Sequence, residues 1–354
     1  MNIKSVRSYK KRLALKRPYT IARNTFSEVE IVFFEIELKN GIIGIGASST
    51  DEEVVGENAD HTVANLGSDI VQQLAGKDVR HFLYHINFYR QHFSEFPGTQ
   101  AAIDIALHDA FCQWIGIPVV DFYGRYHEKL LTSVTIGIKG IEETLEEANE
   151  YYERGFKALK VKTGLDAALD AERIIKLREK FDDYFTVRVD ANTGYDLYEL
   201  KTFLKKSKDC NVELVEQPFY PGMEKEMLKL PIETRMLMAA DESLKNAKSA
   251  LELTHQMAFG IFNIKLMKCG GIRGAFDIAT IAKQAGISLF WGCNDESIVS
   301  ITAALHAAFA CPHTRYIDLD GSLDLAEDIV KEGFELKNGY MMLVNKPGLG
   351  VTQL

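Results

Sequence analysis

The segment ALKVKT at residues 158–163 indicates the fold of the chain, because it is a short β-type run that contains polar residues near its end and leads into a helical pattern. The same arrangement recurs as FTVRVD at 185–190, VELVE at 212–216 and IFNIK at 261–265. Strands that alternate with helices along a chain form parallel sheets. We therefore expect the second part of this protein to be built around a parallel sheet.

The number and spacing of these runs indicate a closed barrel. Eight runs follow residue 128, since residues 131–138, 236–241, 287–292 and 316–319 have the same character. Seven runs close on a polar residue, with steps of 28, 26, 25, 24, 28 and 25 residues between closures. The closing residues are Lys162, Asp190, Glu216, Asp241, Lys265, Cys293 and Asp318. A repeated unit of one strand and one helix predicts an α/β fold, a (β/α)7β TIM-like barrel.

The alternative is an open doubly wound sheet, which would need a glycine-rich phosphate turn after a first strand. Gly41, Gly44 and Gly46 lie within a predicted hairpin and no helical pattern follows them, so we interpret them as turn glycines. The barrel is therefore the preferred topology.

The first 128 residues have a different pattern. The run 30–38, a turn at 40–41 and the run 42–47 predict a β-hairpin. Three later segments have apolar residues at helical spacing: 59–74, 80–93 and 99–115. We expect an α+β capping domain at 1–128, a barrel domain at 129–325 and a carboxyl-terminal segment at 326–354 that returns to the cap.

Composition argues against several classes of partner. The 354 residues include 41 Lys plus Arg and 50 Asp plus Glu, a formal net charge of −9, whereas nucleic-acid binders carry basic surfaces. The same acidic surplus disfavours an anionic membrane surface. The amino terminus lacks the apolar core of an export signal, and the most apolar helical stretch is about half the length that spans a bilayer. Five cysteines without a CxxC pair are typical of buried thiols in a reducing compartment, so we expect a cytoplasmic protein.

Three consecutive predicted barrel strands, the third to the fifth, end in Asp190, Glu216 and Asp241. The carboxyl ends of barrel strands meet at one mouth, which carries the chemistry of such barrels. Any one of these residues alone would more commonly cap the next helix. Three carboxylates in register repel one another unless a cation joins them, and oxygen ligands without His or Cys favour Mg²⁺.

Two lysines are predicted to lie on opposite sides of this mouth. In a ring of eight strands, Lys162 on the second strand and Lys265 on the sixth face each other. Opposed lysines on either side of one carbon suit a 1,1-proton transfer, in which one removes the α-proton and the other returns a proton to the opposite face. Lys160 points the same way as Lys162, and its charge would lower the pKa of Lys162.

An aspartate pair is predicted on the side of the mouth away from the metal. Asp318 and Asp320 share one face of the eighth strand, which lies opposite the fourth in the ring. A ligand that spans the mouth would therefore meet a metal at one end and two carboxylates at the other.

These motifs resemble those of the enolase superfamily, in its muconate-lactonising subgroup, and most closely those of dipeptide epimerases such as L-Ala-D/L-Glu epimerase. The resemblance covers nearly the whole chain. KVK at 160–162 matches the paired-lysine strand, and NIKLMK at 263–268 matches the strand with the opposing lysine. The three metal-ligand motifs are matched by VDAN at 189–192, EQP at 216–218 and DES at 241–243. The resemblance implies a lysine base, Mg²⁺ and an enediolate intermediate.

Asp318 and Asp320 match the feature that separates dipeptide epimerases from their relatives, and a carboxylate pair suits a free α-ammonium group. Arg23, in a loop at 18–27 that we expect to close over the mouth, resembles the arginine that recognises glutamate in the Ala-Glu enzymes. A surface arginine is the alternative for Arg23, and its apolar neighbours would also permit an apolar substrate side chain. The stretch GCNDES at 292–297 departs from the more apolar residues of those enzymes.

The resemblance thus implies a Mg²⁺-dependent dipeptide epimerase, an isomerase that inverts the α-carbon of the second residue through an enediolate, with Lys162 and Lys265 as catalytic residues. The expected substrate-binding residues are Lys160, Asp318, Asp320, Thr135, Cys293 and Arg23; ordinary packing is the alternative for Thr135 and Cys293. We expect one Mg²⁺ per subunit, a small-molecule dipeptide substrate, and a homo-oligomer. The alternatives are a cycloisomerase, an o-succinylbenzoate synthase or an acylamino-acid racemase of the same superfamily, and a non-catalytic barrel that binds a partner.

Overall fold

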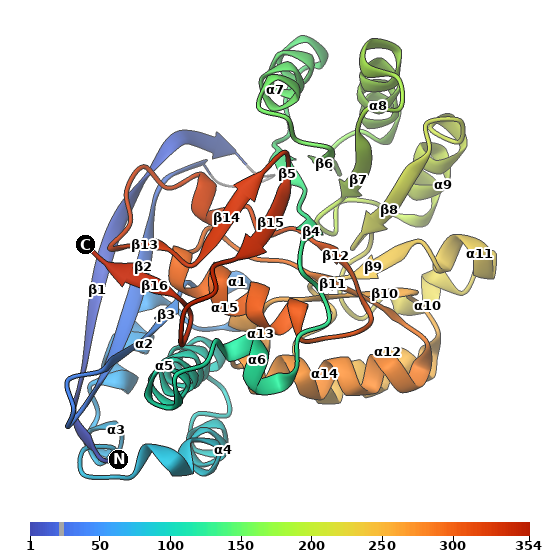
Figure 1. Ribbon diagram of the computed structural model, residues 1–354. Coiled ribbons are helices and arrows are strands. Elements are labelled where there is room, and N and C mark those ends of the chain that lie inside the picture. Colours follow the sequence, from blue (N-terminus) through green and yellow to red (C-terminus); the bar gives the residue numbers. More distant parts are fainter. Residues whose placement is uncertain (21–24) are drawn as a thin grey trace.

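The computed structural model describes residues 1–20 and 25–354, and an eight-stranded parallel sheet lies at its centre (Figure 1). The strands of this sheet lie in chain order, so each strand pairs with the next one along the sequence. The strands are β5 (Val134–Ile136), β6 (Ala158–Lys162), β7 (Thr186–Asp190), β8 (Val212–Glu216), β9 (Met238–Ala240), β10 (Ile261–Ile264), β11 (Ser288–Trp291) and β12 (Thr314–Ile317). A parallel bridge between Thr132 and Ile317 joins the first strand region to the last, so the predicted barrel is confirmed.

Helices alternate with these strands and surround the sheet (Figure 1). They are α7 (Ile141–Glu153), α8 (Ala167–Phe181), α9 (Leu197–Lys206), α10 (Glu224–Met227), α11 (Ile232–Arg235), α12 (Ala247–Gln256), α13 (Leu266–Cys269), α14 (Ile272–Ala285) and α15 (Ile298–Phe309). After β12 the chain forms the short 3-10 helix η2 (Gly321–Leu323). Seven strand-helix units and a final strand therefore form the (β/α)7β fold.

Two of the predicted barrel strands differ in extent from the sequence pattern. The run at 131–138 divides into β4 (Leu130–Leu131) and β5, because β4 leaves the barrel and pairs with a carboxyl-terminal strand. The eighth strand begins at Thr314, before the predicted start at 316. The hydroxyl of Thr314 accepts a hydrogen bond from Trp291 Nε1 at 2.8 Å. A polar residue that is satisfied inside the fold is not recognisable as buried from sequence.

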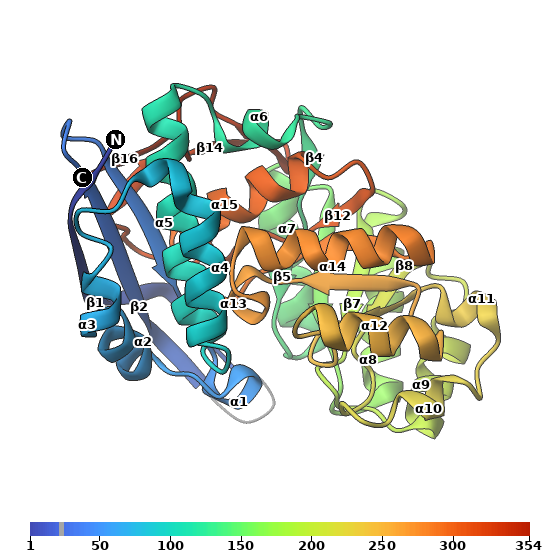
Figure 2. The same ribbon diagram turned by 90° about the horizontal axis from the view of Figure 1, so that it is seen from below.

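The amino-terminal sheet is antiparallel and contains β1 (Ile3–Thr20), β2 (Thr25–Leu38) and β3 (Ile43–Ser48) in that order (Figure 2). The elements that follow are α1 (Glu52–Val55), α2 (Ala59–Leu66), α3 (Asp69–Gln72), η1 (Val79–His81), α4 (Phe82–His92), α5 (Pro97–Ile115) and α6 (Val119–Tyr123). The expected α+β character is therefore observed, although the helical pattern at 59–74 is broken at Gly67.

Helix α5 packs directly on β3, and two of the glycines interpreted as turn residues make this packing close. Gly41 has a positive φ of 88° and does lie in the turn. Gly44 and Gly46 lie within β3 instead, where a Cβ would collide with Ala106 or Ala102 of α5. The turn interpretation was wrong for these two because close helix–strand packing also requires glycine.

The carboxyl-terminal residues contact both α5 and the barrel. They form β13 (Val330–Glu332), β14 (Phe334–Lys337), β15 (Tyr340–Leu343) and β16 (Val351–Gln353). The backbone N–H of Leu349 donates to Asp109 of α5 at 2.8 Å. His306 of α15 accepts from Val120 N–H through Nδ1 at 3.0 Å, and its Nε2 lies 3.2 Å from the Leu349 carbonyl.

Within the described residues, no helix combines the length and apolarity that crossing a bilayer demands.

Because His306 is buried at this junction, its protonation is coupled to stability. Burial lowers the pKa of His306 to about 4. The pKa of His306 is therefore lower in the folded protein than in the unfolded chain. Its contribution to the free energy of unfolding is complete above about pH 6.5 and decreases as the pH falls. We expect the wild type to lose about 2 kcal/mol of unfolding free energy through this residue between pH 7.5 and pH 5. In His306→Ala this part of the pH dependence should be absent in urea unfolding, and the variant should be less stable at pH 7.5.

The exposed His255 on α12 supplies the control, since His255→Ala should retain the wild-type pH dependence. Parallel pH profiles for His306→Ala and the wild type would contradict the assignment.

Candidate active site at the barrel mouth

The candidate site lies at the carboxyl ends of neighbouring strands, where the pairing register brings the predicted residues together. Lys162 of β6 pairs with Asp190 of β7, and Asp190 pairs with Glu216 of β8. Asp241 and Lys265 follow the next two strands, β9 and β10, directly. The three carboxylates and both lysines are thus placed on consecutive strand ends, as in the predicted barrel.

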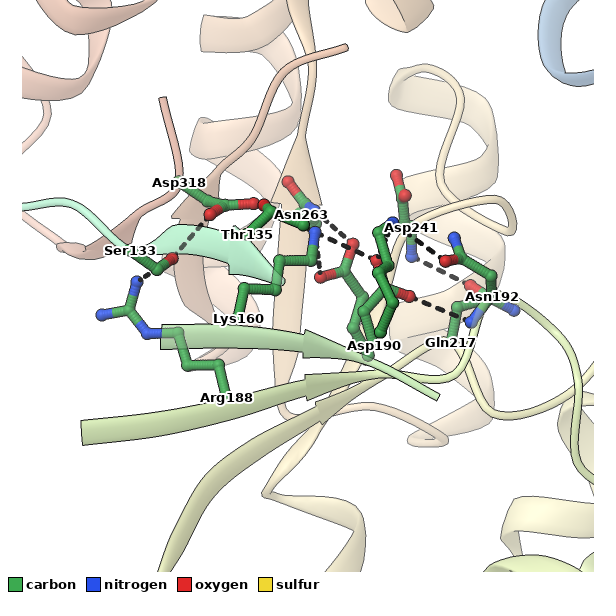
Figure 3. A network of polar contacts seen from close by, with 12 residues as sticks. Ser133, Thr135, Lys160, Arg188, Asp190, Asn192, Gln217, Asp241, Asn263 and Asp318 are labelled. Atoms are coloured by element: carbon green, nitrogen blue, oxygen red, sulfur yellow. Dashed lines mark hydrogen bonds and ion pairs between the residues drawn. The ribbon is translucent and has the colours of Figure 1, made fainter. Parts of the chain in front are cut away.

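Lys160 is the centre of the ionic network (Figure 3). Its ammonium lies 3.0 Å from Asp190 Oδ2, 3.0 Å from Glu216 Oε2 and 3.0 Å from Asp318 Oδ2. The residue is only 3% exposed. Burial lowers the pKa of Lys160, but the surrounding carboxylates outweigh burial and raise the pKa well above its usual range. The three carboxylates therefore favour the charged form of Lys160 in this structure.

The two predicted catalytic lysines are each paired with a carboxylate. Lys162 Nζ lies 2.8 Å from Asp190 Oδ2 and donates to Asn192 Oδ1 at 2.9 Å. Lys265 Nζ lies 2.9 Å from Asp241 Oδ2. Burial lowers the pKa of Lys265, but the charge of Asp241 outweighs burial, so the pKa of Lys265 is raised above its usual range. Lys265 can become a neutral base only when the charge of Asp241 is engaged elsewhere.

Burial raises the pKa of each of the three carboxylates, and the neighbouring charges decide the net shift. Burial raises the pKa of Glu216, and the charge of Asp190 raises it further. For Asp190, burial is outweighed by Lys160 and Lys162, which lower its pKa. Lys265 and Lys268 likewise outweigh burial at Asp241 and lower its pKa. Glu216 is thus the carboxylate that the lysines of the site compensate least.

The residues of this mouth fit a divalent cation. Glu216 Oε2 is a buried oxygen that accepts no hydrogen bond from the part of the chain that the structure describes. Six carboxyl groups lie near four lysines, so the mouth is rich in oxygen donors. These residues are Asp190, Glu216, Asp241, Glu242, Asp318 and Asp320, with Lys160, Lys162, Lys265 and Lys268. Carboxylate oxygen donors suit Mg²⁺.

The carboxylates do not converge on one point in this structure. Within residues 1–20 and 25–354, no three acidic, His or Cys side chains form a ready-made metal cluster. The Lys160 ammonium lies 3.0 Å from both Asp190 Oδ2 and Glu216 Oε2.

The aspartate pair lies where the first and last strands meet. Asp318 Oδ1 accepts from the Ser133 hydroxyl at 2.6 Å, and Asp320 Oδ2 accepts from Thr135 N–H at 2.8 Å. Cys293 Sγ lies 3.3 Å from the Asp318 carbonyl oxygen. Burial and the charge of Asp318 raise the pKa of Asp320 well above its usual range. The predicted residues Thr135, Cys293, Asp318 and Asp320 are therefore neighbours, whereas Arg23 lies outside the described residues.

Several polar residues of the site were not predicted. Arg188 of β7 donates to the Ser133 hydroxyl at 3.1 Å and to the Ile317 carbonyl at 2.7 Å, which supports Asp318 indirectly. Asn263 and Lys268 contact the metal-ligand candidates. The alternation of side chains along a strand could have indicated Arg188 and Asn263. Each lies two positions before a predicted site residue, Asp190 or Lys265, and therefore points to the same face.

Comparison with known proteins places this geometry in context. Residues 3–124 match the model for the mandelate racemase/muconate lactonizing enzyme amino-terminal domain, and residues 143–353 match the enolase C-terminal domain-like model. The chain is 50% identical over 355 residues to L-Lys-D/L-Arg epimerase of Desulforapulum autotrophicum, with 100% of both chains covered. It is 44% identical to L-Lys-D/L-Arg epimerase of Methylococcus capsulatus, with 99% of each covered. A crystal structure of dipeptide epimerase from Methylococcus capsulatus, complexed with Mg and L-Arg-D-Lys, superimposes with a TM-score of 0.97 at 44% identity and covers 99% of this chain and 100% of that chain.

Binding of Mg²⁺ at the three carboxylates should stabilise the folded protein. At a concentration of one hundred times Kd, binding adds about 2.7 kcal/mol. For a chain of this size we expect the melting temperature to rise by about 5 °C. Glu216→Gln, which removes the charge of one ligand, should lose most of this increase in a thermal-shift assay.

Glu233→Gln changes an exposed glutamate on α11 and serves as the control. An equal Mg²⁺ response in Glu216→Gln and in the wild type would rule out Glu216 as a ligand.

Proposed function

The chain belongs to the enolase superfamily, in the mandelate racemase/muconate lactonizing enzyme family, and from this premise we propose that it is a dipeptide epimerase that acts on cationic dipeptides with Mg²⁺. The reaction inverts the α-carbon of the second residue of the dipeptide. One observation carries the proposal: Lys162 ends β6 and Lys265 directly follows β10, two strands that are four apart in the barrel, on either side of the carboxylate trio.

The proposed reaction gives a task to each group of residues. Lys162 and Lys265 move a proton to and from opposite faces of one α-carbon, which produces inversion. Asp190, Glu216 and Asp241 would hold Mg²⁺, which when bound stabilises negative charge on the substrate carboxylate. The protonated Lys160 adds positive charge beside them. Asp318 and Asp320 would receive the α-ammonium group at the other end.

The magnitudes show why the electrostatic residues must contribute most. A turnover of about 10 s⁻¹ corresponds to a barrier of roughly 16 kcal/mol. A positioned proton-transfer group contributes about 10²- to 10⁴-fold, or roughly 3–5 kcal/mol. The α-proton of a carboxylate is only weakly acidic, so the remaining stabilisation must come from positive charge near the developing anion.

A preference for cationic side chains is supported by acidic residues next to the ammonium end. Burial, together with the charges of Asp295 and Glu147, raises the pKa of Asp324 to about 6. The charge of Asp324 is also one of the causes that raise the pKa of Asp320. A lysine or arginine side chain on the first residue of the dipeptide would offset this negative charge.

Neither substrate class expected from the sequence was cationic. Arg23 had indicated glutamate, and its neighbours had indicated an apolar side chain. The stretch 292–297, which departs from the more apolar residues of the Ala-Glu enzymes, contains Asp295 and supports the proposed cationic preference.

Incubation with Mg²⁺ and a dipeptide library in D₂O tests the reaction. We expect α-deuterium at the second residue, with the fastest exchange for Lys- and Arg-containing dipeptides. Lys162→Ala and Lys265→Ala should each reduce net epimerisation by at least about 10³-fold, because one face of the α-carbon then has no base. Each single variant should retain exchange on the remaining face, which mass spectrometry and chiral analysis can measure.

Full epimerisation by Lys265→Ala would refute the two-base reaction. Lys176→Ala, at an exposed ion pair on α8, is the matched control and should leave the rate unchanged.

Substrate preference should depend on Asp324. In Asp324→Asn we expect kcat/KM for Lys-first dipeptides to fall by about 10-fold, since a charge-assisted contact contributes roughly 1.5 kcal/mol. Ala-first dipeptides should be affected much less. Asp183→Asn, at an exposed position after α8, is the control; equal losses for Lys-first and Ala-first dipeptides in Asp324→Asn would argue against a specificity role.

A further inference from the structure

Each of the three metal-ligand candidates has one carboxylate oxygen held by a donor of the protein and one oxygen that faces the lysines. For Asp190, Oδ1 accepts from the Asn192 backbone N–H at 3.0 Å, while Oδ2 lies 2.8 Å from Lys162 Nζ. The backbone N–H of Asn192 and the ammonium of Lys162 thus approach different oxygens of the Asp190 carboxylate.

The same division occurs at Glu216. Its Oε1 accepts from the Asn263 side-chain amide at 2.6 Å, and both residues are completely buried. Its Oε2 is the buried oxygen that accepts no hydrogen bond from the described residues. Asn263 lies against Gly292, where an added Cβ would collide with its amide, so glycine at this position leaves the space that the amide occupies.

Lys268 performs this task for Asp241. Its ammonium is bonded to Asp241 Oδ1, to the Asp241 carbonyl oxygen at 2.5 Å and to the Asn263 carbonyl oxygen at 3.2 Å. These three acceptors match the three N–H donors of an ammonium, and the residue is only 4% exposed. Asp241 Oδ2 remains on the side of Lys265.

We propose that Asn263 and Lys268 are positioning residues that make the site selective for Mg²⁺ over Ca²⁺. With one oxygen of each carboxylate already engaged, the three side chains offer three single oxygens. Mg²⁺ takes six ligands and keeps positions for water and substrate, whereas Ca²⁺ takes six to eight and commonly uses both oxygens of a carboxylate. Donors that block the second oxygen therefore disfavour Ca²⁺ and leave Mg²⁺ unaffected.

This inference rests on the proposed function only in that the same carboxylates hold the metal; it concerns metal binding without substrate. Failure of the two can therefore be told apart. An enzyme that binds Mg²⁺ selectively but exchanges no α-proton would refute the proposed reaction alone.

The test compares Kd for Mg²⁺ and Ca²⁺, measured by displacement of Mn²⁺ followed by electron paramagnetic resonance. The wild type should bind Mg²⁺ at least 10-fold more tightly than Ca²⁺. Lys268→Met and Asn263→Ala each free one carboxylate oxygen, and each should reduce this ratio by 10-fold or more. Lys268→Arg retains a charged donor and should restore much of the selectivity, while Lys176→Met, at an exposed lysine of α8, should not change it.

A purely structural role predicts a different result, in which both affinities fall together and the ratio stays constant. That outcome in a folded variant would overturn the inference, as would a wild-type protein that binds Ca²⁺ as tightly as Mg²⁺. Asn263→Ala removes a neutral group and keeps the test decisive where Lys268→Met does not fold.

Discussion

The structure depends on the burial of the Lys160 ammonium among three carboxylates. Removing charged groups from water is costly, and a buried ion is stable only where opposite charges and hydrogen bonds surround it. Lys160 lies at equal distances of 3.0 Å from Asp190, Glu216 and Asp318, so it joins both halves of the site. The carboxylates that would hold the metal and the aspartate that would receive the ammonium are thereby parts of one charge network.

Beneath this network the barrel is closed by aromatic and aliphatic side chains. Phe290 and Tyr316 belong to a buried cluster, and Arg188 lies over both rings at 5.5 and 5.2 Å. Cations over aromatic faces are stabilised by the ring quadrupole. Arg188 and Lys160 therefore lie between the apolar interior and the charged mouth, with their aliphatic stems buried and their charges paired.

The cap contacts the part of the barrel that carries Lys265. Helix α13 follows Lys265 directly, and Met267 of that helix accepts a hydrogen bond from Ser49 N–H through its sulfur at 3.3 Å. Asp104 of α5 accepts from Ile272 N–H at 2.8 Å, at the start of α14. The segment between these two contacts includes Lys268, so the cap, the proposed base and the proposed metal-selectivity residue are held by one short stretch of chain.

The sequence by itself determined the barrel, the mouth and the identity of the charged residues at the strand ends, because the strand-helix spacing and the alternation of side chains are local properties. It also indicated Mg²⁺ through Asp190, Glu216 and Asp241. Only the tertiary structure decided which oxygen of each carboxylate is held, since Asn263 reaches Glu216 from 47 positions away. The tertiary structure also brings Asp324, which follows η2, close enough to Glu147 of α7 for the charge of Glu147 to raise the pKa of Asp324. Charge compensation and hydrogen-bond partners are set by distance in space, and spacing along the chain does not contain that distance.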